Sequence, residues 1–130
     1  MKKRYSRIIV IASVFVLMFT NTTTLFALED TSMGSIYGYH SITRMKVGYY
    51  LIDASMFGEP ESSTEPSPSV QIIVFGYASD GRNIGGREAS GTSRCSVSFG
   101  PTDVSDRFAY GRVYSYLEGY DLGSMQVYAS

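Results

Sequence analysis

A stretch of 31 residues, 69–99, contains two β-patterned arms joined by a glycine-rich connection. The first arm, residues 70–77 (VQIIVFGY), is apolar on both parities, which is the pattern of a strand covered on both faces. The second arm, residues 94–99 (RCSVSF), alternates as a strand with one solvent-exposed face does. The connection contains Asp80-Gly81 and Gly85-Gly86, which tolerate the positive φ of a chain reversal. We therefore expect an antiparallel hairpin with a long, mobile connection.

Further strands must complete the core, because each arm could cover only half of it. Residues 35–53 alternate for much of their length and predict one long strand, or two strands with a break near residues 40–43. Residues 108–117 and 122–129 alternate around a turn at residues 118–121 and predict a second hairpin. Residues 28–34 (LEDTSMG) predict only an N-terminal tether.

The predicted fold class is all-β: a small antiparallel two-sheet β-sandwich of five to seven strands, formed by residues 28–130 as one domain. Regularly spaced short strands without a helical period are typical of sandwiches and, failing that, of small barrels. A Pro/Ser/Glu-rich loop is predicted at residues 58–69, which hold three of the four prolines and no large apolar residue. The alternative for this loop is a glycosylated or partner-binding segment.

The first 27 residues have the three parts of a secretory signal peptide: a basic head, an apolar middle and a small residue at the end. The apolar run, residues 8–19, is 12 residues long, well below the roughly 20 needed to cross a bilayer. We therefore expect a secreted, extracellular protein with no stable membrane span after cleavage. An uncleaved membrane anchor is the alternative.

Removal of that segment would change the charge of the chain, because it carries four basic residues and no acidic ones. Of 11 Lys and Arg and 12 Asp and Glu, 7 basic and 12 acidic residues would remain, a net charge of −5. The remaining basic residues are scattered singly, which argues against a nucleic-acid partner. A cell-surface glycan or protein is the expected kind of partner.

Cys95 is the only cysteine, so the chain forms no internal disulfide. It is interpreted as a small apolar side chain on an inward strand face, and the alternative is a thiol that joins two chains.

The chain lacks the residue sets of the common catalytic and cofactor sites. His40 is the only histidine, it lies among strand-forming residues, and no G-x-S-x-G motif is present. One histidine and one cysteine 55 positions apart do not make a zinc site. Asp80 with Asn83, and Asp103 with Asp106, are better explained as turn-capping residues than as calcium ligands. No catalytic residue, metal or cofactor is therefore predicted. The sequence leaves one alternative open, a pair of carboxylates for glycoside hydrolysis, because such a pair is brought together by the fold and not by sequence spacing.

Tyrosine is the most unusual feature of the composition, since 10 of the 11 tyrosines follow residue 27 and tryptophan is absent. The candidate ligand- or partner-binding residues share one strand parity and its neighbour: Phe108, Tyr110, Arg112, Tyr114, Tyr116 and Tyr128. If this parity faces solvent, it forms an aromatic platform suited to sugars or to a partner protein. If it faces the core, the rings are simply packed.

The segments CSVSFGP, AYGRVYSY and SMQVYAS, together with the leader, resemble small secreted β-sandwich proteins of Gram-positive bacteria, a loose group that includes lactococcin-type bacteriocins. The resemblance covers residues 70–130 and implies a two-sheet antiparallel sandwich, export and no cofactor. This chain differs from that group by its greater length, its lack of tryptophan and its proline loop, and no functional residue is carried over.

The function expected from the sequence is that of a secreted, non-enzymatic binding module at the bacterial cell surface or in the medium. The alternatives are a bacteriocin-like antimicrobial protein, against which the acidic charge argues, and a small secreted hydrolase.

Overall fold

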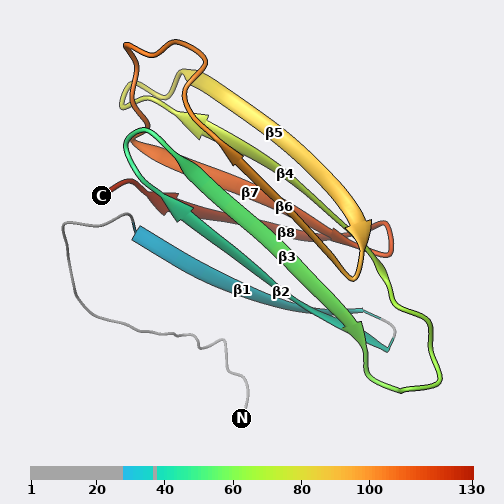
Figure 1. Cartoon of the computed structure of the whole chain (residues 1–130). Helices are drawn as coiled ribbons and strands as arrows, with labels where there is room; N and C mark the ends of the chain where they lie inside the picture. The colour runs from blue at the N-terminus through green and yellow to red at the C-terminus, as the bar shows by residue number, and fades with distance from the viewer. Residues whose placement is uncertain (1–27, 37) are drawn as a thin grey trace.

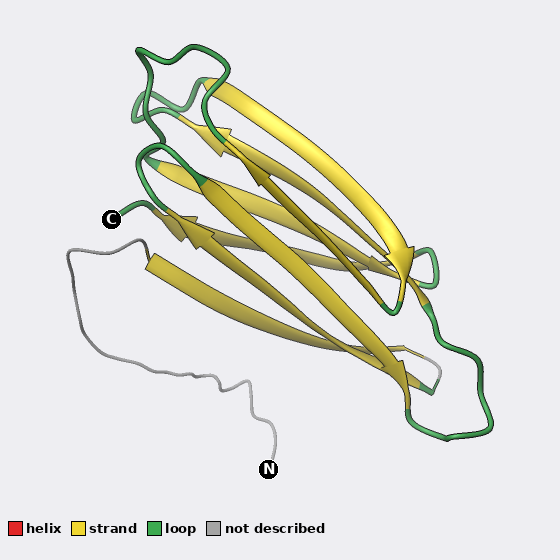
Figure 2. Ribbon diagram, in the orientation of Figure 1, coloured by secondary structure: helices red, strands yellow, loops and turns green. Residues whose placement is uncertain are grey.

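The computed structural model describes residues 28–36 and 38–130, which fold as eight antiparallel strands in two sheets of four, with no helix in this part of the chain (Figures 1 and 2). The predicted all-β, two-sheet sandwich is thus confirmed. The strands are β1 (Leu28–Ile36), β2 (Tyr39–Val47), β3 (Ile52–Pro60), β4 (Ser69–Tyr77), β5 (Asn83–Thr92), β6 (Arg94–Phe99), β7 (Tyr110–Leu117) and β8 (Tyr120–Tyr128). The predicted signal peptide lies outside the described residues.

The strand order is β1-β2-β3-β6 in the first sheet and β5-β4-β7-β8 in the second. The chain therefore changes sheet after β3, after β5 and after β6, and the two sheets lie face to face in Figure 1. Strands β1, β2 and β3 form a meander, while β4–β5 and β7–β8 are hairpins within the second sheet.

One hydrophobic core fills the space between the sheets, and it follows from period-two alternation. Every second residue of β3, β4 and β7 is buried while the residues between them are exposed or half-buried. Burying a large apolar side chain stabilises the fold by roughly 1.5–3 kcal/mol. The principal core residues are Met45, Val47, Ile52, Met56, Val70, Ile72, Val74, Phe99, Phe108, Val113 and Leu117.

The hairpin predicted for residues 69–99 is wrong, because its two arms belong to different sheets. Strand β4 pairs with β5 and β7, whereas β6 pairs with β3. The glycine-rich segment expected to be a mobile connection is mostly β5, and only residues 78–82 form the turn before it. Glycine fits in β5 because the Phe75 ring covers position 86, where a Cβ would lie 2.9 Å from Phe75 Cδ1. The chain crosses back to the first sheet at Ser93, which has a φ of 71°.

The N-terminal part of the chain also differs from the prediction. Residues 28–34, expected to be a tether, belong to β1, whose pairing with β2 runs from Leu28–Val47 to Ile36–Tyr39. Both interpretations of residues 35–53, one long strand or a break near residues 40–43, are wrong. Residues 40–43 lie inside β2, and the chain reverses between Ile36 and Tyr39 and again at residues 48–51. As a result, the sandwich has eight strands rather than five to seven. Polar residues can form β1 because an edge strand needs to bury few side chains.

The second predicted hairpin is present, with bounds shifted to β7 and β8. Its two-residue turn is Glu118-Gly119, with φ values of 51° and 82°. Positive φ at both positions matches the right-handed twist of the flanking strands. The loop predicted at residues 58–69 is shorter than expected, since β3 continues to Pro60 and β4 begins at Ser69.

Candidate functional site

The tyrosine-rich parity of β7 faces outward. Gly111, Val113, Ser115 and Leu117 are buried against the core, while the residues between them are half-buried on the outer surface of the second sheet. We call this outer surface the tyrosine face. It consists of Phe75 and Tyr77 of β4, Tyr110, Arg112, Tyr114 and Tyr116 of β7, and Gln126 and Tyr128 of β8.

The rings of the tyrosine face other than Tyr116 form a continuous row across three strands, in which Phe75 contacts Tyr77 with ring centroids 6.5 Å apart. Tyr77 and Tyr110 are directly paired across β4 and β7 and stack with ring centroids 4.9 Å apart at 16°. The ring centroids of Tyr110 and Tyr128 are 5.9 Å apart, which extends the row to β8. The rings of Phe75 and Tyr114 pack edge to face, with centroids 6.2 Å apart and planes at 78°. Each such pair contributes about 0.5–1.5 kcal/mol beyond its buried area. The row is therefore held rigid before any ligand arrives.

A polar chain runs beside the rings. The Arg112 guanidinium donates to Gln126 Oε1, and Gln126 Nε2 donates to the Tyr128 hydroxyl at 3.1 Å. Hydrogen bonding to Tyr114 raises the pKa of Arg112, which is a fixed cation in any case. The face thus presents one positive group held among aromatic rings and hydroxyls.

Phe108 does not lie on the tyrosine face, which corrects the site predicted from parity. It is 1 % exposed and precedes β7, which begins at Tyr110. Its ring packs edge-on against Phe99 at 5.8 Å and fills the space above Gly76. Parity counting failed here because the segment from 100 to 109 is irregular, so its side chains do not follow the alternation of the strand.

Phe75 and Tyr77 are members of the face that the sequence prediction missed. The second apolar parity of residues 70–77 was a signal for them, but it was interpreted as a surface covered by another layer. That interpretation is wrong: these side chains are half-buried, and rings of β7 contact them from the side. Their place beside Tyr110 depends on the β4–β7 pairing, which a single sequence does not reveal.

His40 is a half-exposed strand residue. Its Nε2 lies 2.8 Å from Glu59 Oε1, across the β2–β3 pair, and the two side chains are 43 % and 49 % exposed. This is a surface cross-strand pair on the outer side of the first sheet, on the opposite side of the sandwich from the tyrosine face.

Cys95 lies on the inward parity of β6 and is half-buried. Burial raises the pKa of its thiol, and this change favours the neutral, less reactive form. Its position agrees with the interpretation as a small core side chain.

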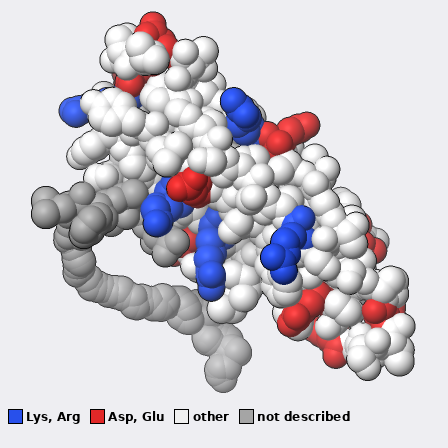
Figure 3. All heavy atoms as spheres, viewed as in Figure 1, with Lys and Arg blue, Asp and Glu red and all other residues white. Residues whose placement is uncertain are grey.

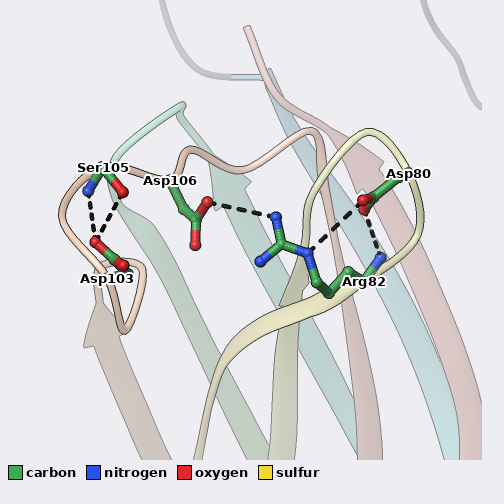
Figure 4. A network of polar contacts seen from close by, with 5 residues as sticks. All are labelled: Asp80, Arg82, Asp103, Ser105 and Asp106. Carbon is green, nitrogen blue, oxygen red and sulfur yellow. Dashed lines mark hydrogen bonds and ion pairs between the residues drawn. The ribbon is translucent and has the colours of Figure 1, made fainter.

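The Asp residues of the two loops cap turns, as predicted. The Arg82 backbone N–H donates to Asp80 Oδ1 at 3.0 Å, and the Ser105 N–H and hydroxyl both donate to Asp103 Oδ1, at 2.9 and 2.8 Å (Figure 4). The Arg82 side chain joins the loops by reaching Asp106 Oδ1 at 3.4 Å. These backbone hydrogen bonds lower the pKa of the Asp80 and Asp103 carboxyl groups.

Residues 28–36 and 38–130 were searched for a metal site and for a membrane-spanning helix. No group of three or more His, Cys, Asp or Glu side chains is placed to hold a metal ion there. The same residues contain no helix that could span a bilayer.

Comparison of the chain with protein-family models, with curated proteins and with solved structures finds no match.

Proposed function

We propose that this chain is a secreted, non-enzymatic binding module whose tyrosine face contacts a partner protein outside the cell. The observation that supports this most strongly is the preformed row of rings from Tyr128 through Tyr110 and Tyr77. Rings fixed by one another lose little side-chain entropy on binding, and this loss is one of the penalties of association.

The geometry of the rings favours a protein over a sugar. A sugar ring stacks on a flat aromatic face, but Tyr77 and Tyr110 each have one face covered by the other ring. Half-buried tyrosines and one 60 % exposed tyrosine, Tyr128, offer ring edges and hydroxyls instead. Such a surface combines apolar contact area with hydrogen bonding, as protein-binding surfaces rich in tyrosine do.

Secretion supports the same proposal, since the basic and apolar leader at residues 1–27 would direct the chain to the outside. The bacteriocin-like and hydrolase alternatives gain no specific observation from the described residues.

The experiment is a binding comparison between the protein and its Y114S/Y116S variant. Immobilised protein is presented with extracellular proteins of the producing cells and, separately, with protease-treated wall polysaccharide. We expect one protein to be retained in a saturable, near-stoichiometric amount and to be lost with Y114S/Y116S.

The matched control is Y50S, which removes a 62 % exposed tyrosine at the turn between β2 and β3, away from the face. It should bind like the parent, and circular dichroism should show all three proteins folded. Retention of polysaccharide alone, or equal binding by Y114S/Y116S, contradicts the proposal. If Y114S/Y116S unfolds, the more exposed Tyr128→Ser replaces it.

A further inference from the structure

The outer side of the first sheet has a shallow groove over β2, β3 and β6. We call it the basic groove. It encloses about 430 Å³, and the side chains that matter below are Arg44, Ser55, Phe57, Arg94 and Ser96. Figure 3 shows Lys and Arg side chains on the face that these strands present to the viewer, with acidic side chains also among them.

The strand register explains why the groove is hollow. Arg44, Ser55 and Ser96 form one row across the three strands, and Phe57 and Arg94 are paired in the next row. The short serines therefore form a floor in the middle, and a long basic side chain rises on either side. Strands lie roughly 4.8 Å apart, so β2 and β6 are about 10 Å apart across β3, a width that two arginines can span from opposite sides.

The two arginines are available to a ligand. Both are exposed, and neither takes part in any of the ion pairs that join described side chains, which involve His40 and Arg82. The Arg94 guanidinium lies 5.9 Å from the centre of the Phe57 ring, which orients it at the groove edge. This is local positive charge on a chain whose net charge is −1.

The groove continues into a second hollow. The two share Arg44, Ser55 and Ser96, and the second adds Lys46, Asp53 and Ser98. Lys46 lies two residues beyond Arg44 on the same face of β2, roughly 6.8 Å along the strand. Asp53 is paired with Lys46 across β2 and β3 and offsets its charge, so Arg44 and Arg94 are the main cations of the groove. Two separated cations match a ligand with repeated negative groups better than a single small ion.

We propose that the basic groove binds an acidic polysaccharide. Arg44 and Arg94 would each hold a carboxylate through paired N–H donors. Ser55 and Ser96 hydroxyls would exchange hydrogen bonds with sugar hydroxyls, and Phe57, which is 40 % exposed, would contact an apolar sugar face. The site is on the opposite side of the sandwich from the tyrosine face, so a polysaccharide and a protein could be held at once.

The test measures the binding of polygalacturonate oligomers to the full chain, with dextran as the neutral polymer. We expect binding that weakens with added salt, no binding of dextran, and about a tenfold loss for Arg44→Ser and for Arg94→Ser, because each removes a charge-assisted contact.

Arg87→Ser is the matched control, since Arg87 is an exposed arginine on β5 of the other sheet. It should bind like the parent, and so should Y114S/Y116S, which separates this site from the proposed function. Equal thermal midpoints for all variants exclude loss of folding.

Four results would overturn the proposal: no binding of polygalacturonate, equal binding of dextran, equal losses for Arg87→Ser and Arg94→Ser, or tighter binding of polyphosphate or single-stranded DNA than of polygalacturonate. The last result would assign the groove to phosphate polymers or to nucleic acid instead.

Discussion

Gly76 of β4 lies directly under the ring of Phe108, so close that a Cβ at position 76 would overlap the ring. Phe108 is the largest of the fully buried side chains. The absence of a side chain near the end of β4 is therefore what lets the segment after β6 close one end of the core.

Gly76→Ala should lower the free energy of unfolding by about 1–3 kcal/mol, because the methyl group overpacks the core. Urea denaturation measures this. Phe108→Leu should relieve the overlap, so the double variant should lose less than the sum of the two single losses. Additive losses would show that Gly76 and Phe108 do not meet.

Thr43→Val should raise the free energy of unfolding by about 1 kcal/mol. The Thr43 and Ser41 hydroxyls are buried, with no hydrogen-bond partner among the described residues, and a buried unsatisfied group is destabilising. Valine keeps the shape and removes the hydroxyl. The control is Thr31→Val on the exposed side of β1, which should change stability little, and a destabilised Thr43→Val would mean that the hydroxyl is bonded.

Acid should weaken the loops that Arg82 joins. Backbone hydrogen bonds from Arg82 and Ser105 lower the pKa of Asp80 and Asp103 in the folded chain. A lowered carboxyl pKa stabilises the fold above the unfolded value of about 3.9, and this contribution is lost as the pH falls through the folded pKa.

The variant D80N/D103N should therefore show a shallower fall of unfolding free energy below pH 4 than the parent, measured by urea denaturation across the acid range. Identical slopes would mean that these two carboxyl groups keep their unfolded pKa values.

Cys95 should react slowly with a thiol reagent while the protein is folded, because burial raises its pKa and shields it. Reaction rates in buffer and in guanidinium chloride make the comparison. Equal rates, or a disulfide-linked dimer on a non-reducing gel, would support the alternative of a thiol that joins two chains.

Alternation alone was enough to predict much of the core. Val70, Ile72 and Val74 share one parity of a segment with strong β propensity, and all three are buried. The last hairpin was equally clear, since Glu118-Gly119 separates two alternating segments.

Strand β5 could not be predicted in this way. Its glycines lower its intrinsic β propensity, and it is a strand because Phe75 and neighbouring backbone cover those glycines. That cover comes from tertiary contacts, which local sequence does not encode.

The tyrosine face was predicted in part for the same reason. Tyr110, Tyr114 and Tyr116 lie on one strand, so their common side follows from alternation. Tyr77 lies beside them only because of the β4–β7 register, which pairs it with Tyr110. Phe108 does not lie on the same side, because it belongs to the irregular loop that precedes β7.

The most direct test of the proposed function places a photo-crosslinking phenylalanine derivative at position 128, where Tyr128 ends the row of rings. Irradiation with extracellular proteins of the producing cells should give one discrete protein adduct. The same group at position 50 should give none. No adduct at 128, or equal adducts at both positions, would contradict the account.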